Sequence, residues 1–437
     1  MRHLLADTTP LRVSPDYRRL WFGLSVSNIG TQVTIVAVGL QIYALTGSTL
    51  AVGLLGLFSL VPLVALGLYG GALVDHYDRR KVSLVSSLVL WVVVAGIAAQ
   101  AWLGLESVHL LYGLVAVQSA AFAINNPARS AIIPRLLPKE LLPAANALAT
   151  LSMNVALTGG PLIGALLVAQ LGYAWAYTLD MVLFLAALWA VFRLPPVLPE
   201  SDVADGGAPL STRGRLGGVG LRSVLDGLRY LATQPNVRTT FLVDICAMVL
   251  SFPRVLWPAA GVIYLGGGET TTGVLAAAFA VGGILASVFS GGLTRMRKQG
   301  QVIVWAITAW GVSIAAFGLV LVLVGRGSPD GAIVWAVVTA GIALAFAGGS
   351  DSISSVFRQS ILQTATPDHM RGRLQGVFIV VVAGGPRLGE MVLGAEATWF
   401  GEGWAAVVGG LSCLVLLWVI VWLTPRFWRY DARHPEP

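Results

Sequence analysis

The stretch GGALVDHYDRRKV, residues Gly70–Val82, decides the fold because it marks a tight turn between two helices that cross a membrane. An apolar run over 50–74 precedes the turn, and about 20 apolar residues are enough to cross a bilayer. Asp75 ends this run, three consecutive cations follow it, and the next apolar run begins at Val82. Gly70 and Gly71 let a neighbouring helix approach closely. The stretch therefore predicts a short loop at a membrane face.

The composition favours a membrane protein along the whole chain. Of 437 residues, 56% are apolar and 11% are charged, whereas soluble proteins carry about 25% charged residues. Apolar runs of about 20 residues recur, which is typical of transmembrane helices, while a membrane β-barrel would show alternating segments of about 10 residues. The net charge of +7 is located in short loops between these runs, so it orients the helices and does not indicate a nucleic-acid partner.

We expect an all-α membrane protein with twelve transmembrane helices in two pseudo-symmetric six-helix bundles. The predicted domains are an N-terminal bundle (1–194), a cytoplasmic linker (195–236), a C-terminal bundle (237–424) and a cytoplasmic tail (425–437). The linker carries one apolar face, which predicts an amphipathic helix on the membrane surface or a plain connector helix. The predicted spans are 20–45, 50–74, 82–104, 108–128, 142–170, 173–194, 238–265, 271–294, 301–325, 332–357, 372–399 and 403–424.

Charge placement predicts the orientation. The cation-rich loops all fall on one side of the predicted spans, and the opposite loops hold a single cation, Arg326. The positive-inside rule assigns the cation-rich side to the cytoplasm, and an even number of spans then places both termini there.

The sequence does not contain the residue patterns of an enzyme, a nucleotide-driven pump or a metal site. Cys246 and Cys413 each lie in an apolar run, and we interpret them as small core residues. None of the five histidines lies well inside an apolar run, and there is no phosphate-binding G-x-x-x-x-G-K-[ST] loop. We therefore expect no cofactor, no metal site and no enzyme.

The two halves of the chain repeat each other. Pro15-Asp-Tyr-Arg18 matches Pro235-Asn-Val-Arg238, and Gly160-Pro161-Leu-Ile-Gly164 matches Gly385-Pro386-Arg-Leu-Gly389. Arg129 and Arg358 occupy equivalent positions after the fourth and tenth spans. Parallel six-helix repeats are the plan of major facilitator transporters.

With this repeat in view, the chain resembles the major facilitator superfamily. Gly71, Leu73, Asp75, Arg79 and Arg80 occupy the slots of its G-x-L-x-D-x-x-x-R-R/K loop signature. Segments 126–134, 254–258 and 362–373 resemble the branch that contains enterobactin exporters and macrolide-efflux proteins. The resemblance implies alternating access and secondary active export, commonly by proton antiport. It also implies a small-molecule substrate (a siderophore or a drug), protons as a partner, and a multi-pass protein, which we expect to be monomeric, in the bacterial cytoplasmic membrane.

Two motifs receive gating roles from this resemblance. Asp75, Arg79 and Arg80 would close the cytoplasmic side, with Asp75 against the positive end of the eleventh helix. Gly160, Pro161 and Gly164 resemble the antiporter motif of helix five, in which close helix contact and a proline bend would seal the cavity. An ordinary transmembrane kink explains the same residues.

Charged residues inside predicted spans are candidates for transport because a charge in hydrocarbon costs at least about 2.5–3.5 kcal/mol. Arg254 lies between Pro253 and Pro258, where its guanidinium either holds an anionic or catechol-like group or pairs with an acid of another helix. Trp257 is a possible platform for the substrate. Arg387 and Glu390 can pair along one helix face.

The proton carrier is expected among Asp351, Glu390 and Asp244, since a carboxyl half-withdrawn from water can bind a proton near neutral pH. Asp351 and Arg358 share one helix face. Asp180 and Glu396 lie toward the outer face, where we expect them to be solvated.

Four amides, Asn28, Gln32, Gln118 and Asn125, complete the predicted substrate path on spans one and four, although hydrogen bonds between helices would also account for them. Three functions remain open at this point: siderophore export, multidrug or macrolide efflux, and a lipid-handling or non-transporting role on the same fold. Arg254 favours an anionic or catecholate ligand.

Overall fold

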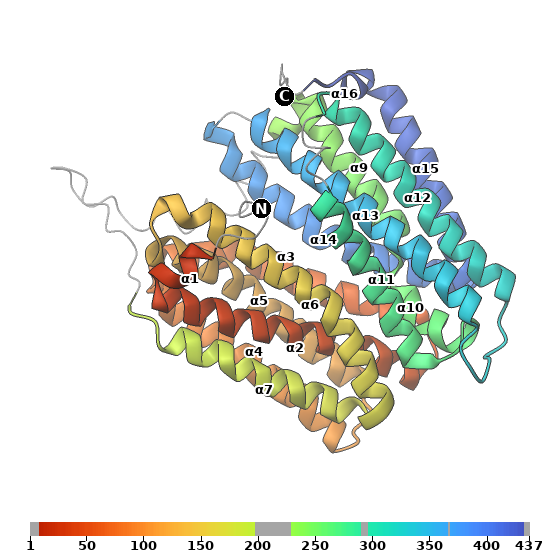
Figure 1. Ribbon diagram of the computed structural model, residues 1–437, viewed down its shortest axis with the longest axis horizontal. Helices are drawn as coiled ribbons and strands as arrows, with labels where there is room; N and C mark the ends of the chain where they lie inside the picture. Colours follow the sequence, from red (N-terminus) through yellow and green to blue (C-terminus); the bar gives the residue numbers. More distant parts are fainter. Residues whose placement is uncertain (1–7, 197–228, 290–295, 366–367, 432–437) are drawn as a thin grey trace. The chain divides into compact units, whose positions relative to one another are not determined.

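The computed structural model describes residues 8–196, 229–289, 296–365 and 368–431, and these residues form helices without strands (Figure 1). Side chains at 68–76, 288–289, 368–380 and a few single positions are outside this description, as is most of the expected amphipathic linker helix. The helices are α1 (Thr9–Val13), α2 (Pro15–Thr46), α3 (Thr49–His76), α4 (Arg79–Trp102), α5 (Val108–Leu136), η1 (Lys139–Leu141), α6 (Leu142–Leu171), α7 (Tyr173–Phe192), α9 (Pro235–Ser251), η3 (Pro253–Leu256), α10 (Trp257–Ala259), η4 (Ala260–Tyr264), α11 (Gly268–Phe289), α12 (Gln299–Val324), α13 (Val334–Thr364), α14 (Asp368–Phe400), α15 (Glu402–Leu423) and α16 (Pro425–Trp428).

The expected all-α membrane architecture is confirmed. Within the described residues, 11 helices are long and apolar enough to cross a membrane, and they correspond to the first ten predicted spans and the last one. The remaining predicted span, 372–399, falls within α14, which is partly outside the description, so the count of twelve stays a prediction.

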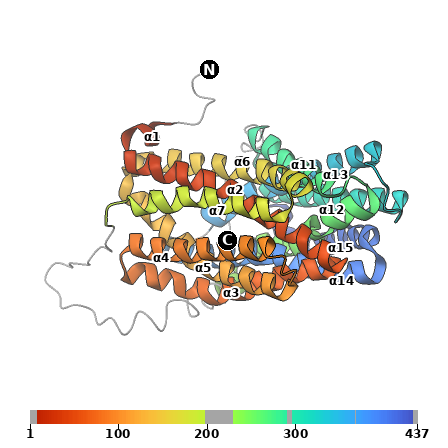
Figure 2. The same ribbon diagram turned by 90° about the horizontal axis from the view of Figure 1, so that it is seen from below.

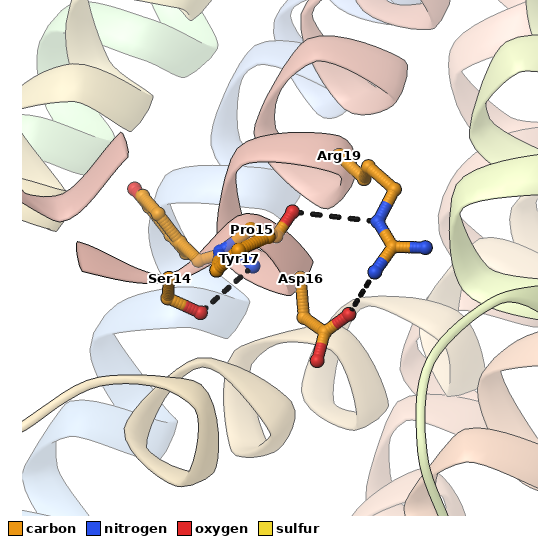
Figure 3. Close-up of polar contacts among 5 residues, drawn as sticks. All are labelled: Ser14, Pro15, Asp16, Tyr17 and Arg19. Atoms are coloured by element: carbon orange, nitrogen blue, oxygen red, sulfur yellow. Dashed lines mark hydrogen bonds and ion pairs between the residues drawn. The ribbon is translucent and has the colours of Figure 1, made fainter. Parts of the chain in front are cut away.

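Prolines start the first helix of each half. α2 begins at Pro15 and α9 at Pro235, where the missing N–H costs nothing because the first turn of a helix has no internal acceptor. At the start of α2 the Ser14 hydroxyl accepts a hydrogen bond from the Tyr17 N–H, 3.2 Å away (Figure 3). Arg19 forms an ion pair with Asp16 and donates to the Pro15 carbonyl at 3.4 Å. This turn is therefore fixed by its own polar groups.

The chain divides into two compact units. The first unit comprises Met1–Ala37, Val61–Gly160 and Leu171–Ser223, and the second comprises Val38–Leu60, Pro161–Gln170 and Val224–Pro437. The division crosses the helices α2, α3 and α6. In α3 it falls one residue before Pro62, and in α6 it falls between Gly160 and Pro161. Proline removes a helical hydrogen bond and weakens the helix locally, so two of the three crossings coincide with sites of easy bending.

Apolar side chains from four helices form the core of the first unit. Leu20, Ile132 and Val191 join α2, α5 and α7, and Leu90 packs with Phe184 between α4 and α7. The helices α2 and α7 lie side by side in both views (Figures 1 and 2). Gly23 makes their contact possible, because a Cβ at this position would lie 2.6 Å from the Ala186 carbonyl oxygen.

In the second unit α12 packs against α13 and α15, and α9 packs against α14 and α15. Glycines again bring backbones together: a Cβ at Gly318 of α12 would lie 2.6 Å from the Gly403 carbonyl oxygen of α15. Close backbone approach increases van der Waals contact, which holds membrane helices together where apolar burial from lipid gives no advantage.

We predict that Gly23→Val lowers the free energy of unfolding by about 1–3 kcal/mol, because the new side chain overpacks the contact between α2 and α7. Thermal unfolding in detergent, followed by the loss of the monodisperse elution peak, measures this change. Gly113→Val is the matched control, since no atom lies within 4 Å of the corresponding Cβ position. Equal thermal stability of the two variants would contradict the assignment.

Candidate functional site

The helix that carries Arg254 is interrupted immediately before this residue. α9 ends at Ser251, Phe252 has an extended backbone (φ −77°, ψ 108°), and the 3-10 turn η3 begins at Pro253. Proline forces the preceding residue out of the helical region, which explains the break. A π-type turn, η4, follows α10, so the segment from Phe252 to Tyr264 is irregular over the second half of the candidate span Pro235–Tyr264.

Arg254 pairs with Glu390 of α14. Its Nε donates to Glu390 Oε1 at 2.5 Å, and its Nη2 contacts the same oxygen. The Glu390 side chain is only 8% exposed, whereas the Arg254 side chain is 40% exposed. The guanidinium is therefore held by a buried carboxylate on one side and leaves donors accessible on the other. Arg387 lies one turn before Glu390 on α14 and is half-buried.

An aromatic cluster, Phe252, Trp257, Phe279 and Trp310, adjoins this pair. The Arg254 Cζ lies 5.7 Å from the centroid of the Phe252 ring, which stacks on Trp310 at 6.3 Å. Phe279 packs edge-on against Trp310 at 6.0 Å and lies 5.8 Å from Trp257. Trp257 is buried, and its Nε1–H has no acceptor among the described residues. This cluster offers flat apolar surface together with one unused hydrogen-bond donor.

Sequence reasoning selected Trp257 but missed Phe252, Phe279 and Trp310. These three residues lie on the irregular segment, α11 and α12, and each is an ordinary aromatic of an apolar run. The break before Pro253 was the one available signal, because it turns Phe252 out of the regular helix.

A second charge cluster joins α9 and α13. The Arg358 guanidinium forms an ion pair with Asp244 and lies 3.5 Å from Asp351 Oδ1. The side chains of Arg358 and Asp244 are each 5% exposed, and that of Asp351 is 32% exposed. Two carboxylates thus share one cation, which leaves an excess negative charge when both are ionised. Binding of one proton would remove it.

The aromatic cluster and the Arg358 cluster meet at Trp310. A cavity of about 10 Å³ is lined by Trp310, Asp351 and Arg358, among others. This volume corresponds to about one water molecule. Since Trp310 stacks on Phe252, which faces Arg254, packed side chains connect the two charge clusters.

A third cluster surrounds Glu402 at the start of α15. Glu402 is 4% exposed and accepts hydrogen bonds from Thr49 (2.9 Å), Tyr264 (3.0 Å) and Arg326 (2.8 Å). Glu402 raises the pKa of Arg326 above its ordinary value, so this loop guanidinium stays charged at all physiological pH values. The cluster lines a cavity of about 520 Å³, and Trp399 and Trp404 are also part of the lining. Sequence reasoning noted Arg326 only as an isolated outer cation and missed Glu402.

In the first unit, Asn125 and Arg129 of α5 bond to serines of α4. The Asn125 amide donates to the Ser86 and Ser87 hydroxyls, each at 2.8 Å, and is 1% exposed. Arg129 Nη2 donates to Ser87 Oγ at 3.1 Å. These bonds tie α4 to α5, in agreement with the interhelical alternative for Asn125.

The other predicted amides of the first unit differ in exposure. Asn28 on α2 and Gln118 on α5 are half-buried, and Gln32 is 9% exposed. Gly160 packs directly on Gln32, since a Cβ at Gly160 would collide with that side chain. α6 therefore touches α2 at the first residue of the predicted antiporter motif.

The other two residues of that motif belong to the second unit. Pro161 and Gly164 are both buried in α6, and the Pro161 carbonyl lies against Gly273 of α11. Ala165 packs on the same glycine, where a Cβ would lie 2.5 Å from the alanine methyl carbon.

The cations of the signature loop bind backbone carbonyls of two other helices in the first unit. Arg79 donates to the Ala131 carbonyl of α5 at 3.3 Å, and Arg80 donates to the Phe192 carbonyl at 2.5 Å. Phe192 is the last residue of α7, where carbonyls lack helical partners and the helix dipole favours cations. Gly71 and Asp75 belong to α3, but the surroundings of both residues are outside the described part of the chain.

The expectation that Asp180 is solvated is wrong. This residue of α7 is 0% exposed, and its Oδ2 accepts a hydrogen bond from Thr34 of α2 at 2.6 Å. Gly30 allows α2 to cover the carboxyl group, because even a Cβ there would lie 2.5 Å from Asp180 Oδ1. The short distance from Asp180 to the end of α7 suggested exposure, but the neighbouring helix closes over it.

Taken together, broken and continuous apolar helices surround several buried ionised groups, and the described residues contain no cluster of three potential metal ligands. This is the architecture of a membrane transporter. A family model described as transmembrane secretion effector matches residues 6–436, and the chain belongs to this family.

Curated relatives cover the full length. The enterobactin exporter EntS of Citrobacter koseri is 26% identical over 435 residues, which make up 99% of this chain and 97% of that protein. EntS of Shigella boydii is 26% identical over 434 residues, with the same coverage. The resemblance to the branch that contains enterobactin exporters is thus confirmed, and the protein is a membrane exporter with a small-molecule substrate.

Solved structures share the fold. The nucleoside transporter NupG has a TM-score of 0.68 at 14% identity and covers 95% of this chain and 99% of its own. A bacterial homologue of the iron transporter ferroportin, in an inward-facing state, has a TM-score of 0.66 at 15% identity and covers 93% of this chain and 98% of its own. These likenesses establish the major facilitator fold.

We predict that Arg358→Leu lowers the free energy of unfolding by about 3–5 kcal/mol, because it leaves Asp244 buried without its cation. The double variant Arg358→Leu with Asp244→Leu is expected to recover most of this loss, since an apolar pair of similar volume replaces the ion pair. Thermal unfolding in detergent measures both variants. If the double variant were less stable than the single one, the pairing would be refuted.

Proposed function

We propose that this protein is a proton-coupled exporter that works by alternating access and expels an anionic or catecholate small molecule such as a siderophore. One observation carries the proposal: the half-exposed guanidinium of Arg254 is held by buried Glu390, beside Trp257 with its unused Nε1–H. The curated relatives, which are enterobactin exporters, support the same class of cargo.

The side chains around Arg254 suit an aromatic anion. Arginine presents a planar fork of donors that matches carboxylate or catecholate oxygens, and it also stacks on aromatic rings. The aromatic cluster supplies ring faces close to that fork. Macrolide or general drug efflux is the second candidate. The same apolar rings favour it, and an uncharged drug would not need the Arg254 guanidinium.

Proton coupling is assigned to the Arg358 cluster. Asp351 is the more exposed of the two carboxylates and lies farther from the shared guanidinium, so it exchanges a proton more readily than Asp244. Glu390 is the alternative carrier, because cargo bound at Arg254 would compete with this carboxylate for the guanidinium.

The remaining assignments follow from the family and the charge pattern. We infer a monomer in the bacterial cytoplasmic membrane with both termini in the cytoplasm. Asp75 acts as a cytoplasmic latch together with Arg79 and Arg80. The amides Asn28, Gln32 and Gln118 contribute to the substrate path.

Arg254→Ala is expected to reduce export of a catecholate siderophore roughly 10- to 150-fold, because it removes a charge-assisted hydrogen bond worth about 1.5–3 kcal/mol. The measurement is uptake of labelled siderophore, and in parallel of a labelled macrolide, by liposomes that contain the purified protein. Arg297→Ala, which removes an exposed arginine of the same unit outside the three charge clusters, is the control and should transport normally. Macrolide transport without siderophore transport would favour the second candidate, and no transport of either would contradict both.

Asp351→Asn is expected to abolish the dependence of export on the pH gradient while exchange of labelled for unlabelled cargo continues. The amide keeps the size of the side chain but cannot release a proton. Export driven by an imposed pH gradient and exchange without one are compared in the same liposomes. Full gradient-driven export by this variant would exclude Asp351 and direct attention to Glu390.

A further inference from the structure

Asp180 occupies a closed polar site inside the first unit. It lies seven residues after the start of α7, or about 10 Å along the helix, and is fully buried. Thr34 donates to Oδ2, whereas Oδ1 has no hydrogen-bond donor among the described residues. Within the same residues no cation pairs with this carboxyl group.

The site is built by two positions of one helix face. Gly30 and Thr34 are four residues apart on α2, so both face α7. Thr34 binds one oxygen, and the missing side chain at Gly30 leaves room for the other. A side chain at position 30 would collide with Oδ1, since even a Cβ there would lie 2.5 Å from this oxygen.

The groups around Asp180 are uncharged near neutral pH. On α7 itself, Tyr173 and Tyr177 are the titratable neighbours, and a phenol ionises only near pH 10. α4 approaches through Trp91, which donates to the Met181 carbonyl at 3.1 Å. α5 contributes Ala121, packed with Phe184. An ionised carboxylate here would have a single hydrogen bond and no counterion. The free energy gained from one hydrogen bond is smaller than the free-energy cost of burying the charge.

We propose that Asp180 is a second proton-binding site of the transporter, with the proton on Oδ1, separate from the Arg358 cluster. The site binds a proton from solvent and returns it to solvent, and no other bond changes. The division between the units crosses α2 between Ala37 and Val38, one turn beyond Thr34. Thr34 therefore lies one turn from the point where α2 leaves the unit that contains Asp180, and loss of the contact between Thr34 and Asp180 would open the carboxyl group to water.

This inference rests on the proton-coupled export proposed above and adds a second proton to each cycle. Asp180→Asn keeps the shape of the side chain and an oxygen for Thr34, but it cannot exchange a proton. In liposomes that contain purified protein, the pH gradient that just balances a known cargo gradient gives the number of protons per cargo. We expect this number to fall by one in Asp180→Asn and to be unchanged in Asp16→Asn, which removes an acid of the same unit outside the site. An unchanged number in Asp180→Asn would overturn the proposal.

A second measurement does not depend on transport. The infrared carbonyl band of protonated carboxylic acids should contain one component in the purified wild-type protein at neutral pH that is absent from Asp180→Asn and Asp180→Ser. Identical bands in wild type and both variants would overturn the proposal even if export is proton-coupled. A wild-type protein without any proton coupling would refute the proposed function, and the infrared band would still decide whether Asp180 holds a proton.

Discussion

A charge removed from water must be matched by another charge or by enough hydrogen bonds, and this constraint organises the second unit. Arg254 has Glu390, Arg358 has two aspartates, and Glu402 has three donors. Since removal of one partner from a buried pair costs about 3–5 kcal/mol, each cluster fixes the helices that contribute to it. The proposed cargo and proton sites lie in the same clusters, so the residues that hold these helices together are also those to which we assign transport.

Close helix packing makes these clusters possible. Glycines at positions such as Gly23, Gly30 and Gly318 bring backbones into contact and exclude water from the polar groups beside them. Prolines weaken helices instead of bringing them together. Pro253 breaks the helix immediately before Arg254, and Pro161 lies where α6 passes from one unit to the other. The helix α6 thus contains both a close contact, at Gly160, and a local weakness, at Pro161.

The fold could be predicted from the sequence because its signals are local. A run of apolar residues shows a span by its length alone, and Pro15 and Pro235 mark helix starts within one turn. The partners of the polar groups could not be predicted in this way. Thr34 is 146 positions from Asp180, and Thr49 is 353 positions from Glu402. Helical periodicity tells which face a residue occupies but not which distant helix covers that face, so Asp180 was expected at the surface.

Arg254 and Glu390 illustrate how one pair can serve both stability and transport. Glu390 is almost fully buried, so it needs the guanidinium as long as it is ionised. In the mechanism that we propose, an anionic cargo would compete for that guanidinium, and the competition would raise the cost of keeping Glu390 charged. The packed path from Arg254 through Phe252 and Trp310 reaches the cavity beside Asp351 and Arg358, where two carboxylates already compete for one cation. If cargo binds at Arg254 and a proton binds at Asp351, as we propose, both act on connected side chains, which is the physical requirement for coupling the two.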